Sequence, residues 1–159
     1  MKISIICVGK LKEKYWVDAV AEYSKRLKRF SQIEVIEVAE EATCEDPSEA
    51  QIEKCKEKEG QRLLQKIESG AYCVVMDLRG KKLSSPQLAD KLKEIPLQGK
   101  SHIVFLIGGS FGLSPDCLKR ADFSFSMSDL TFPHQMARVI LLEQIYRGMK
   151  INANEKYHK

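Results

Sequence analysis

Short apolar runs alternate along the chain with longer segments whose apolar residues recur at helical spacing. Residues 2–8, 71–76 and 103–107 are almost continuously apolar, which is typical of strands buried on both faces of a sheet. Residues 33–38, which mix β-branched residues with acids, and residues 123–127, which alternate, predict two further strands. Five helices are expected, over residues 13–30, 48–68 and 86–95, in a short segment that starts at Ser114-Pro115, and over 133–149.

This order of elements predicts an α/β fold with a mostly parallel sheet and helices on both faces. Residues 1–159 are expected to form a single domain, as suits a chain of this length. In such sheets a ligand binds beyond the carboxyl ends of the strands. The segments 76–80, 108–112 and 127–132 are therefore expected to converge on one rim.

Two of these segments have a composition that fits a ligand. Residues 108–112 are rich in glycine, which allows close approach to a backbone, but they match neither a dinucleotide fingerprint nor a P-loop. They form either a binding loop or a plain turn. Residues 127–132 interleave apolar side chains with hydroxyls and backbone groups, a mixture that suits a flat heteroaromatic ring. The alternative is that they only cap and staple the following helix.

Charge is distributed unevenly, although the formal net charge is only +4. Residues 1–32 hold eight Lys/Arg against three Asp/Glu, and residues 133–159 hold five against two. Residues 34–69 hold five against eleven. A basic start and end around an acidic middle is compatible with a phosphate-rich partner, and equally with a solvated surface of mixed charge.

Cysteine usage and hydropathy narrow the class of protein. The five cysteines are odd in number and none has CxxC spacing, so neither a disulfide framework nor a zinc site is indicated, and no metal is expected. No apolar run approaches the ~20 residues of a membrane span, and the start lacks a signal-peptide pattern. A cytoplasmic protein without a membrane partner is expected.

The last helix and the tail carry candidate chemistry. His134 and Arg138 are four residues apart and share a helix face. The apolar residues of this helix exceed one stripe, which indicates docking against the core or against another subunit. The end of the chain, Tyr157-His158-Lys159, offers an aromatic ring, an imidazole and a cation, although a terminal tail is normally disordered. No nucleophile–histidine–acid set stands out.

Four ordered motifs resemble those of one known family. They are Gly108–Ser114, Leu130–Arg138, Leu142–Arg147 and Tyr157–Lys159. Together they resemble the RlmH family, small bacterial methyltransferases of the SPOUT class that act on large-subunit ribosomal RNA. The resemblance covers essentially the whole chain.

The resemblance implies more than the periodicity does. It implies a SPOUT-type fold with a C-terminal trefoil knot, which default topology rules exclude, and S-adenosylmethionine held in the knotted loops. It also implies a homodimer whose active site is completed near the interface, and methylation at N3 of a pseudouridine in large-subunit (23S) ribosomal RNA on the ribosome. The rival interpretations are a non-catalytic ribosome-associated RNA-binding factor and a flavodoxin-type nucleotide-binding module.

Site residues follow from the same resemblance. The implied cofactor-binding residues are Met76, Gly108, Met127, Ser128, Asp129, Leu130, Thr131 and Phe132. The implied catalytic residues beside the substrate are His134, Arg138, Tyr157 and His158. The residues expected to hold RNA phosphates are Arg138, Arg147, Lys150 and Lys159. Either His134 or His158 is a candidate to assist removal of the N3 proton, and the sequence does not choose between them.

Overall fold

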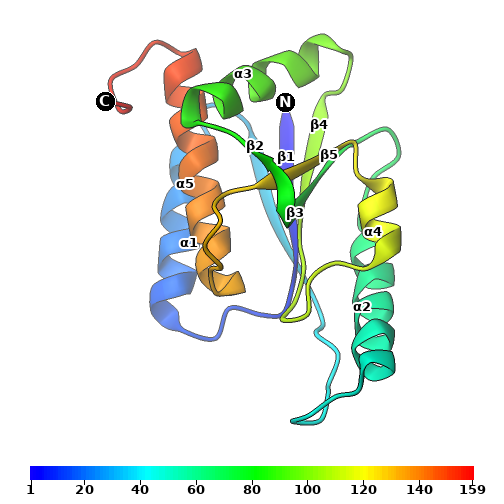
Figure 1. Cartoon of the computed structure of the whole chain (residues 1–159). Coiled ribbons are helices and arrows are strands. Elements are labelled where there is room, and N and C mark those ends of the chain that lie inside the picture. The colour runs from blue at the N-terminus through cyan, green and yellow to red at the C-terminus, as the bar shows by residue number, and fades with distance from the viewer.

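The computed structural model describes residues 1–159 and contains one five-stranded parallel sheet (Figure 1). Its order is β2-β1-β4-β3-β5, and every neighbouring pair is parallel. The strands are β1 (Lys2–Val8), β2 (Gln32–Val38), β3 (Tyr72–Lys82), β4 (His102–Ile107) and β5 (Phe123–Ser126). The expected parallel α/β fold is confirmed.

The helices cover both faces of the sheet, as expected. α1, α3 and α5 pack on one face, and α2 and α4 pack on the other (Figure 1). They are α1 (Lys14–Leu27), α2 (Glu49–Leu64), α3 (Ser85–Leu97), α4 (Pro115–Arg120) and α5 (His134–Asn152). Ser48 and Ser84 close capping boxes that fix where α2 and α3 begin. None of the helices combines the length and apolar character that a membrane crossing requires.

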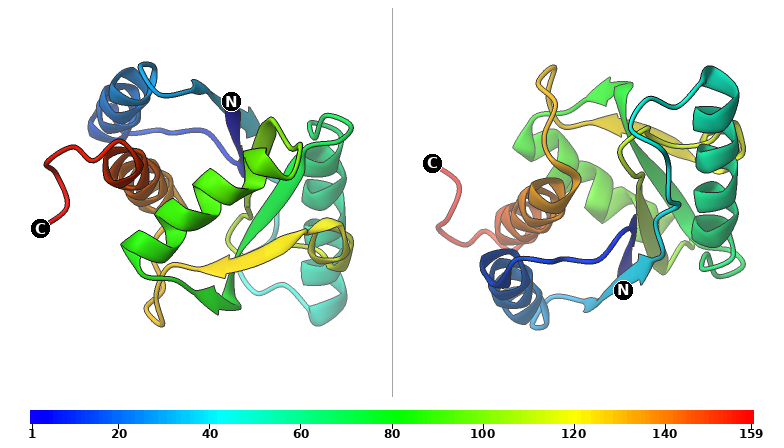
Figure 2. Two further views of the ribbon diagram at one scale, coloured as in Figure 1. Left: turned by 90° about the horizontal axis from the view of Figure 1, so that it is seen from above. Right: turned by 90° about the horizontal axis from the view of Figure 1, so that it is seen from below.

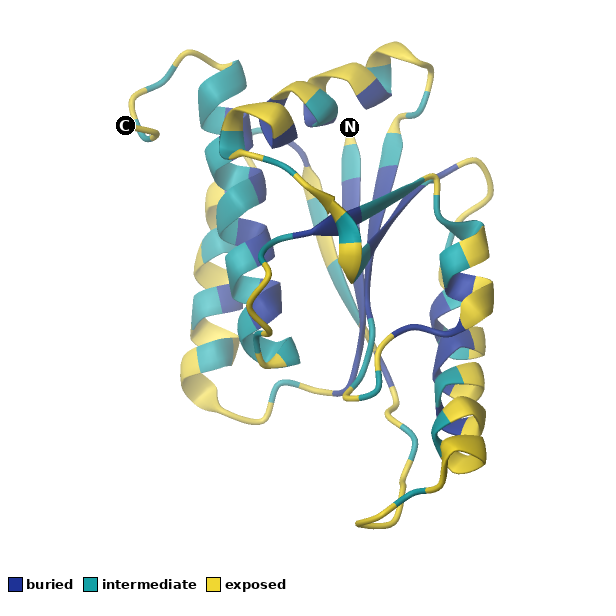
Figure 3. Ribbon diagram, in the orientation of Figure 1, coloured by how far each residue is buried: buried dark blue, intermediate teal, exposed yellow.

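Alternation along the buried strands divides the core into two layers. Ile3 and Ile5 of β1 belong to a cluster of 17 buried residues under α1, α3 and α5. Ile6 and Val8 belong to a cluster of 11 under α2 and α4. The central strands are buried on both sides while the helices are exposed on their outer faces (Figure 3). The apolar runs predict these strands correctly because both faces are covered.

β3 runs further than its apolar run predicts. Its pairing with β5 shifts register between Met76 and Lys81, so the residues between them bulge out and the strand then continues to Lys82. The strand expected over residues 71–76 therefore extends to Lys82 and includes segment 76–80. Pairing with β5 supports this polar extension, which the sequence alone does not reveal.

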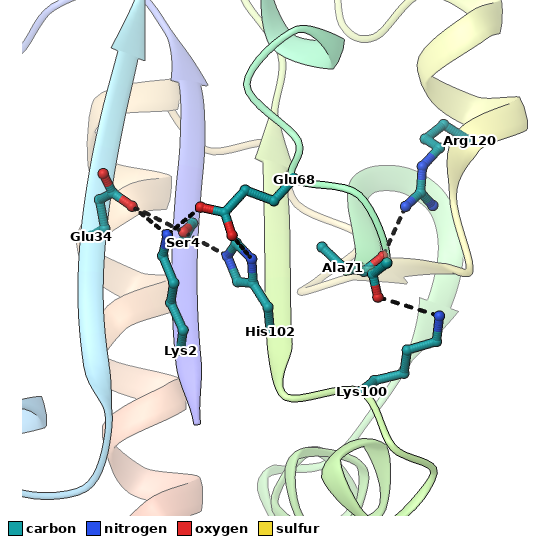
Figure 4. A network of polar contacts seen from close by, with 9 residues as sticks. Lys2, Ser4, Glu34, Glu68, Ala71, Lys100, His102 and Arg120 are labelled. Carbon is teal, nitrogen blue, oxygen red and sulfur yellow. Dashed lines mark hydrogen bonds and ion pairs between the residues drawn. The ribbon is translucent and has the colours of Figure 1, made fainter.

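A polar network joins the amino ends of the strands (Figure 4). Lys2 Nζ lies 3.3 Å from Glu34 Oε2 and also pairs with Glu68, while Ser4 Oγ lies 2.8 Å from His102 Nε2. His102 Nδ1 in turn lies 3.1 Å from Glu68 Oε2. The network lies at the edge of the sheet opposite to the carboxyl ends of the strands.

α5 lies between α1 and α3 (Figure 2). These neighbours bury five apolar side chains of α5 within the protomer, so the apolar excess of this helix is largely explained without a second subunit. They are Ala137, Leu141, Leu142, Ile145 and Met149. The tail turns back onto the helix, because the N–H of Glu155 donates to the carbonyl of Lys150.

Candidate functional site

A cavity of about 790 Å³ opens at the carboxyl ends of β3, β4 and β5. Its volume lies in the range of small-molecule and cofactor sites. The three segments expected to converge do so, since the β3 bulge, the glycine-rich loop after β4 and the segment between β5 and α5 form its walls. The lining includes Met76, Gly108, Met127, Ser128, Leu130, Thr131, Phe132 and His134.

The glycine-rich loop, residues 108–114, folds tightly against itself. A Cβ on Gly108 would lie 2.7 Å from the carbonyl carbon of Gly112, and Gly112 has a φ of +87°. A side chain at position 108 would therefore displace the loop backbone and would not merely fill the cavity. The loop ends at Ser114, whose hydroxyl accepts from the N–H of Cys117 at the start of α4.

The β3 bulge adds charged groups to the wall. Burial disfavours the charge of Asp77, but hydrogen bonds from the side chain and N–H of Arg79 outweigh it, and the pKa of Asp77 is lowered. Lys56 of α2 also lines the cavity. Arg79 falls within a segment expected at the rim, whereas nothing in the local sequence of α2 marks Lys56.

Local hydrogen bonds shape the segment between β5 and α5. The Ser126 hydroxyl donates to the carbonyl of Ser128, and the N–H of Leu130 donates to the Ser128 hydroxyl, both at 3.0 Å. The Leu130 side chain is 69% exposed at the cavity. Asp129 does not line the cavity, and its carboxylate pairs with Lys82 at 2.6 Å. Its contact with the cofactor stays a prediction.

His134 lines the cavity at the first turn of α5. Burial is the main cause that lowers its pKa, and the guanidinium of Arg138 lowers it further, while Glu40 acts in the opposite sense. The imidazole is therefore neutral near pH 7 and able to accept a proton.

Arg138 is the most deeply buried charged residue, with no exposed surface. Its Nη2 donates to the carbonyls of Val8 at 2.7 Å and Gly9 at 2.8 Å, and its Nη1 donates to Glu37 Oε1 at 3.1 Å. The guanidinium thus ties the start of α5 to the end of β1. The guanidinium is not accessible to an RNA phosphate in this protomer, and the phosphate contact of Arg138 stays a prediction.

Tyr157 lies further along α5 than His134 does. Its hydroxyl donates to Glu143 Oε1 at 3.1 Å, its ring packs edge-on against Tyr146, and the guanidinium of Arg147 lies 4.7 Å from its ring centroid. Burial, then a hydrogen bond with Tyr23, raises the pKa of Tyr157 to about 12, so the phenol remains protonated.

The remaining predicted residues lie with Tyr157. Lys150 pairs with Glu155, and His158 and Lys159 are exposed. Glu143 comes nine positions after His134 along α5, a rise of about 14 Å. The candidate catalytic residues therefore form two separate groups within one protomer.

Ser4, His102 and Glu68 form a hydroxyl–imidazole–carboxylate chain that no sequence motif predicts (Figure 4). Its order is that of a nucleophilic triad. Ser4 is only 1% exposed, however, and neither it nor His102 lines the cavity. A substrate cannot reach the hydroxyl, so the arrangement holds the amino ends of the strands together. No group of three or more His, Cys, Asp or Glu side chains is placed to hold a metal ion.

A comparison with known protein families shows the family to which the chain belongs. A family described as "Predicted SPOUT methyltransferase" matches residues 1–158. The chain belongs to the SPOUT methyltransferase family. The match extends over nearly the whole chain and includes all three cavity segments.

Two curated relatives match this SPOUT methyltransferase over its full length and over theirs. The chain is 54% identical over 159 residues to the ribosomal RNA large subunit methyltransferase H of Bifidobacterium adolescentis. It is 53% identical over 159 residues to the protein of the same name from Bifidobacterium animalis subsp. lactis.

Solved structures share the fold of this SPOUT methyltransferase at low sequence identity. A probable methylase family protein from Haemophilus influenzae is 12% identical, with a TM-score of 0.54, covering 99% of this chain and 70% of that one. A putative methyltransferase from Legionella pneumophila, in complex with bound SAM, is 10% identical, with a TM-score of 0.51, covering 96% and 66%. At these identities the likeness establishes the fold alone.

Proposed function

We propose that this protein uses S-adenosylmethionine to methylate large-subunit ribosomal RNA, at N3 of a pseudouridine in the ribosome, in the cytoplasm. The observation that carries the proposal is the full-length identity of 53–54% to ribosomal RNA large subunit methyltransferases H. The cavity at the carboxyl ends of the strands supplies a site for the reaction. Residues 1–159 act as one domain in this proposal, and the C-terminal trefoil knot remains a prediction.

The cavity residues fit S-adenosylmethionine. Met76, Leu130 and Phe132 offer apolar walls for a flat base, and backbone groups of the two flanking loops offer hydrogen bonds to its edge. The glycine-rich loop lets a ligand approach the backbone closely. When bound, S-adenosylmethionine supplies a methyl group activated on a sulfonium, so the protein mainly positions the acceptor.

His134 is the residue best placed to take the proton from the acceptor nitrogen. A uracil-type N3–H is a weak acid, and its proton must leave before the nitrogen carries the methyl group. His134 is at the cavity and is neutral near pH 7. His158 is an exposed residue of the tail, and Tyr157 of the tail packs on α5 far from His134. His158 therefore does not reach this cavity within the protomer.

The separation of the two groups along α5 supports a homodimer. His134 and the cavity occupy one end of the helix, whereas Tyr157 and Arg147 lie about two and a half to three and a half turns away. A second copy can bring its own tail to the cavity and complete the site. Arg147, Lys150, Lys159 and the ring of Tyr157 then contact phosphates and bases of the RNA.

The test is methyl transfer from labelled S-adenosylmethionine to intact ribosomes, with mapping of the modified base. Binding of S-adenosylmethionine is measured in parallel by calorimetry. Leu130→Asp changes an exposed side chain at the cavity and is expected to weaken binding at least about tenfold. Leu97→Asp is the matched control, since Leu97 is 79% exposed and lies outside the cavity.

The outcomes separate the candidate functions. Methylation of a pseudouridine at N3 in the large subunit supports the proposal. Ribosome binding that persists without affinity for S-adenosylmethionine supports a non-catalytic factor. Preference for a flavin supports a flavodoxin-type module.

A further inference from the structure

Glu59 of α2 is the only acidic residue that is buried, with 4% of its surface exposed. Its Oε1 accepts the N–H of Glu41 at 3.0 Å. Its Oε2 is buried without a hydrogen-bond partner. Burying a carboxyl oxygen without a hydrogen-bond partner costs free energy, most of all when the carboxyl is charged.

The free oxygen of Glu59 lies against the glycine-rich loop. A Cβ on Gly109 would lie 2.8 Å from Glu59 Oε2 and 3.2 Å from a methyl carbon of Val8. The next residue of α2, Gly60, packs against Ser114 with no room for a side chain. Two consecutive residues of α2 therefore contact the loop near its start and at its end.

The surroundings of Glu59 shift the equilibrium of its carboxyl toward the uncharged form. Burial is the main cause that raises the pKa of Glu59, and the charge of Glu40 raises it further. The pKa is lowered by three neighbouring groups: the N–H of Glu41, the thiol of Cys55 and the guanidinium of Arg62. Arg62 is itself paired with Glu41 at 2.6 Å. The remaining neighbours, residues 108–114 and β1 at Val8, carry no charged side chain toward it.

Ionisation of this carboxyl would disturb the wall of the cavity. A buried carboxylate without a partner on Oε2 must draw in water. Oε2 lies against Gly109, so water that solvates this oxygen would occupy space beside the loop. Gly109 would move, and with it the backbone that lines the cavity.

We propose that the uncharged carboxyl of Glu59 is a positioning group that holds the glycine-rich loop in the shape that binds S-adenosylmethionine. The inference rests on the proposed cofactor, but Glu59 itself does not touch the cavity. Since the uncharged form supports binding, affinity is full at low pH and falls as the pH rises through the raised pKa.

The experiment is calorimetry of S-adenosylmethionine binding at pH 4.5 to 8.5 with the full-length protein and three variants. Glu59→Gln keeps the shape and a hydrogen-bond donor but cannot ionise. Glu59→Ala removes the support. Glu57→Gln is the matched control, because Glu57 is an exposed acid on the same helix. Thermal melts accompany each titration to report folding.

The expected result has three parts. The Kd of the native protein and of Glu57→Gln rises from pH 4.5 to 8.5 about tenfold more than that of Glu59→Gln. Glu59→Gln binds within about threefold of the native protein at pH 4.5, whereas folded Glu59→Ala binds at least about tenfold more weakly. An equal pH dependence in Glu59→Gln, or native affinity in a folded Glu59→Ala, overturns the proposal. Should Glu59→Ala not fold, the pH comparison decides, and absence of binding by the native protein overturns the proposed function itself.

Discussion

Replacing Arg138 with Met tests whether this residue supports the fold or contacts RNA. Methionine keeps the apolar stem but removes three hydrogen bonds, two of them to the carbonyls of Val8 and Gly9. Each carbonyl left buried without a donor costs about 1–3 kcal/mol. Glu37 is partly exposed, so water compensates its loss. The total expected loss of unfolding free energy is about 3–5 kcal/mol, as for a broken buried ion pair.

Thermal unfolding followed by circular dichroism measures this loss. For a chain of this size about 3–5 kcal/mol corresponds to a fall in Tm of roughly 10 °C. Arg147→Met is the control, because Arg147 forms a partly exposed i,i+4 pair with Glu143 and its removal should cost no more than about 1 kcal/mol. An Arg138→Met protein with native Tm but weakened ribosome binding would refute the reasoning and restore the phosphate contact.

Three further predictions concern the site and its surroundings. His134→Gln should lower kcat on ribosomes at least about a hundredfold. In the native protein the acid limb of kcat against pH should lie below pH 6.5, because burial lowers the pKa of His134. An acid limb above pH 7 would contradict the role of His134 as the proton acceptor. Deleting Asn154–Lys159 should abolish most methylation, while the affinity for S-adenosylmethionine measured by calorimetry stays native. Tm should fall by only a few degrees, because the tail makes mainly partly exposed contacts. Lost cofactor binding would show that the tail closes the cavity. Ser4→Ala should cost about 1 kcal/mol in urea unfolding and leave methylation unchanged, because Ser4 Oγ is buried; a large loss of activity in a folded variant would mean that the hydroxyl is not merely structural.

The fold was predictable where local pattern and burial agree. Residues 2–8 and 103–107 are apolar at every position because both layers of the core contact them, so their strands could be recognised without a partner. The convergence of the three cavity segments followed from the rule that parallel strands present their carboxyl ends together.

Local sequence patterns did not predict the features that depend on contacts between distant segments. The extension of β3 beyond Met76 depends on pairing with β5, and the burial of Arg138 depends on carbonyls about 130 positions away. Ser4, Glu68 and His102 are too far apart in sequence for any motif to connect them. Glu59 lies in a highly charged helix, and only the packing of α2 against the loop distinguishes it from its exposed neighbours.

The two core layers differ in size, and the smaller layer is expected to unfold locally before the larger one. The layer under α2 and α4 contains 11 buried residues, against 17 under α1, α3 and α5. Amide hydrogens of α2 and α4 should therefore exchange with solvent through a sub-global opening that leaves the other layer folded. The glycine-rich loop leads directly into α4, so this opening unit includes one wall of the cavity. A ligand in the cavity would slow exchange in α2 and α4 more than in α1 or α3, which couples occupancy to the weaker half of the protein.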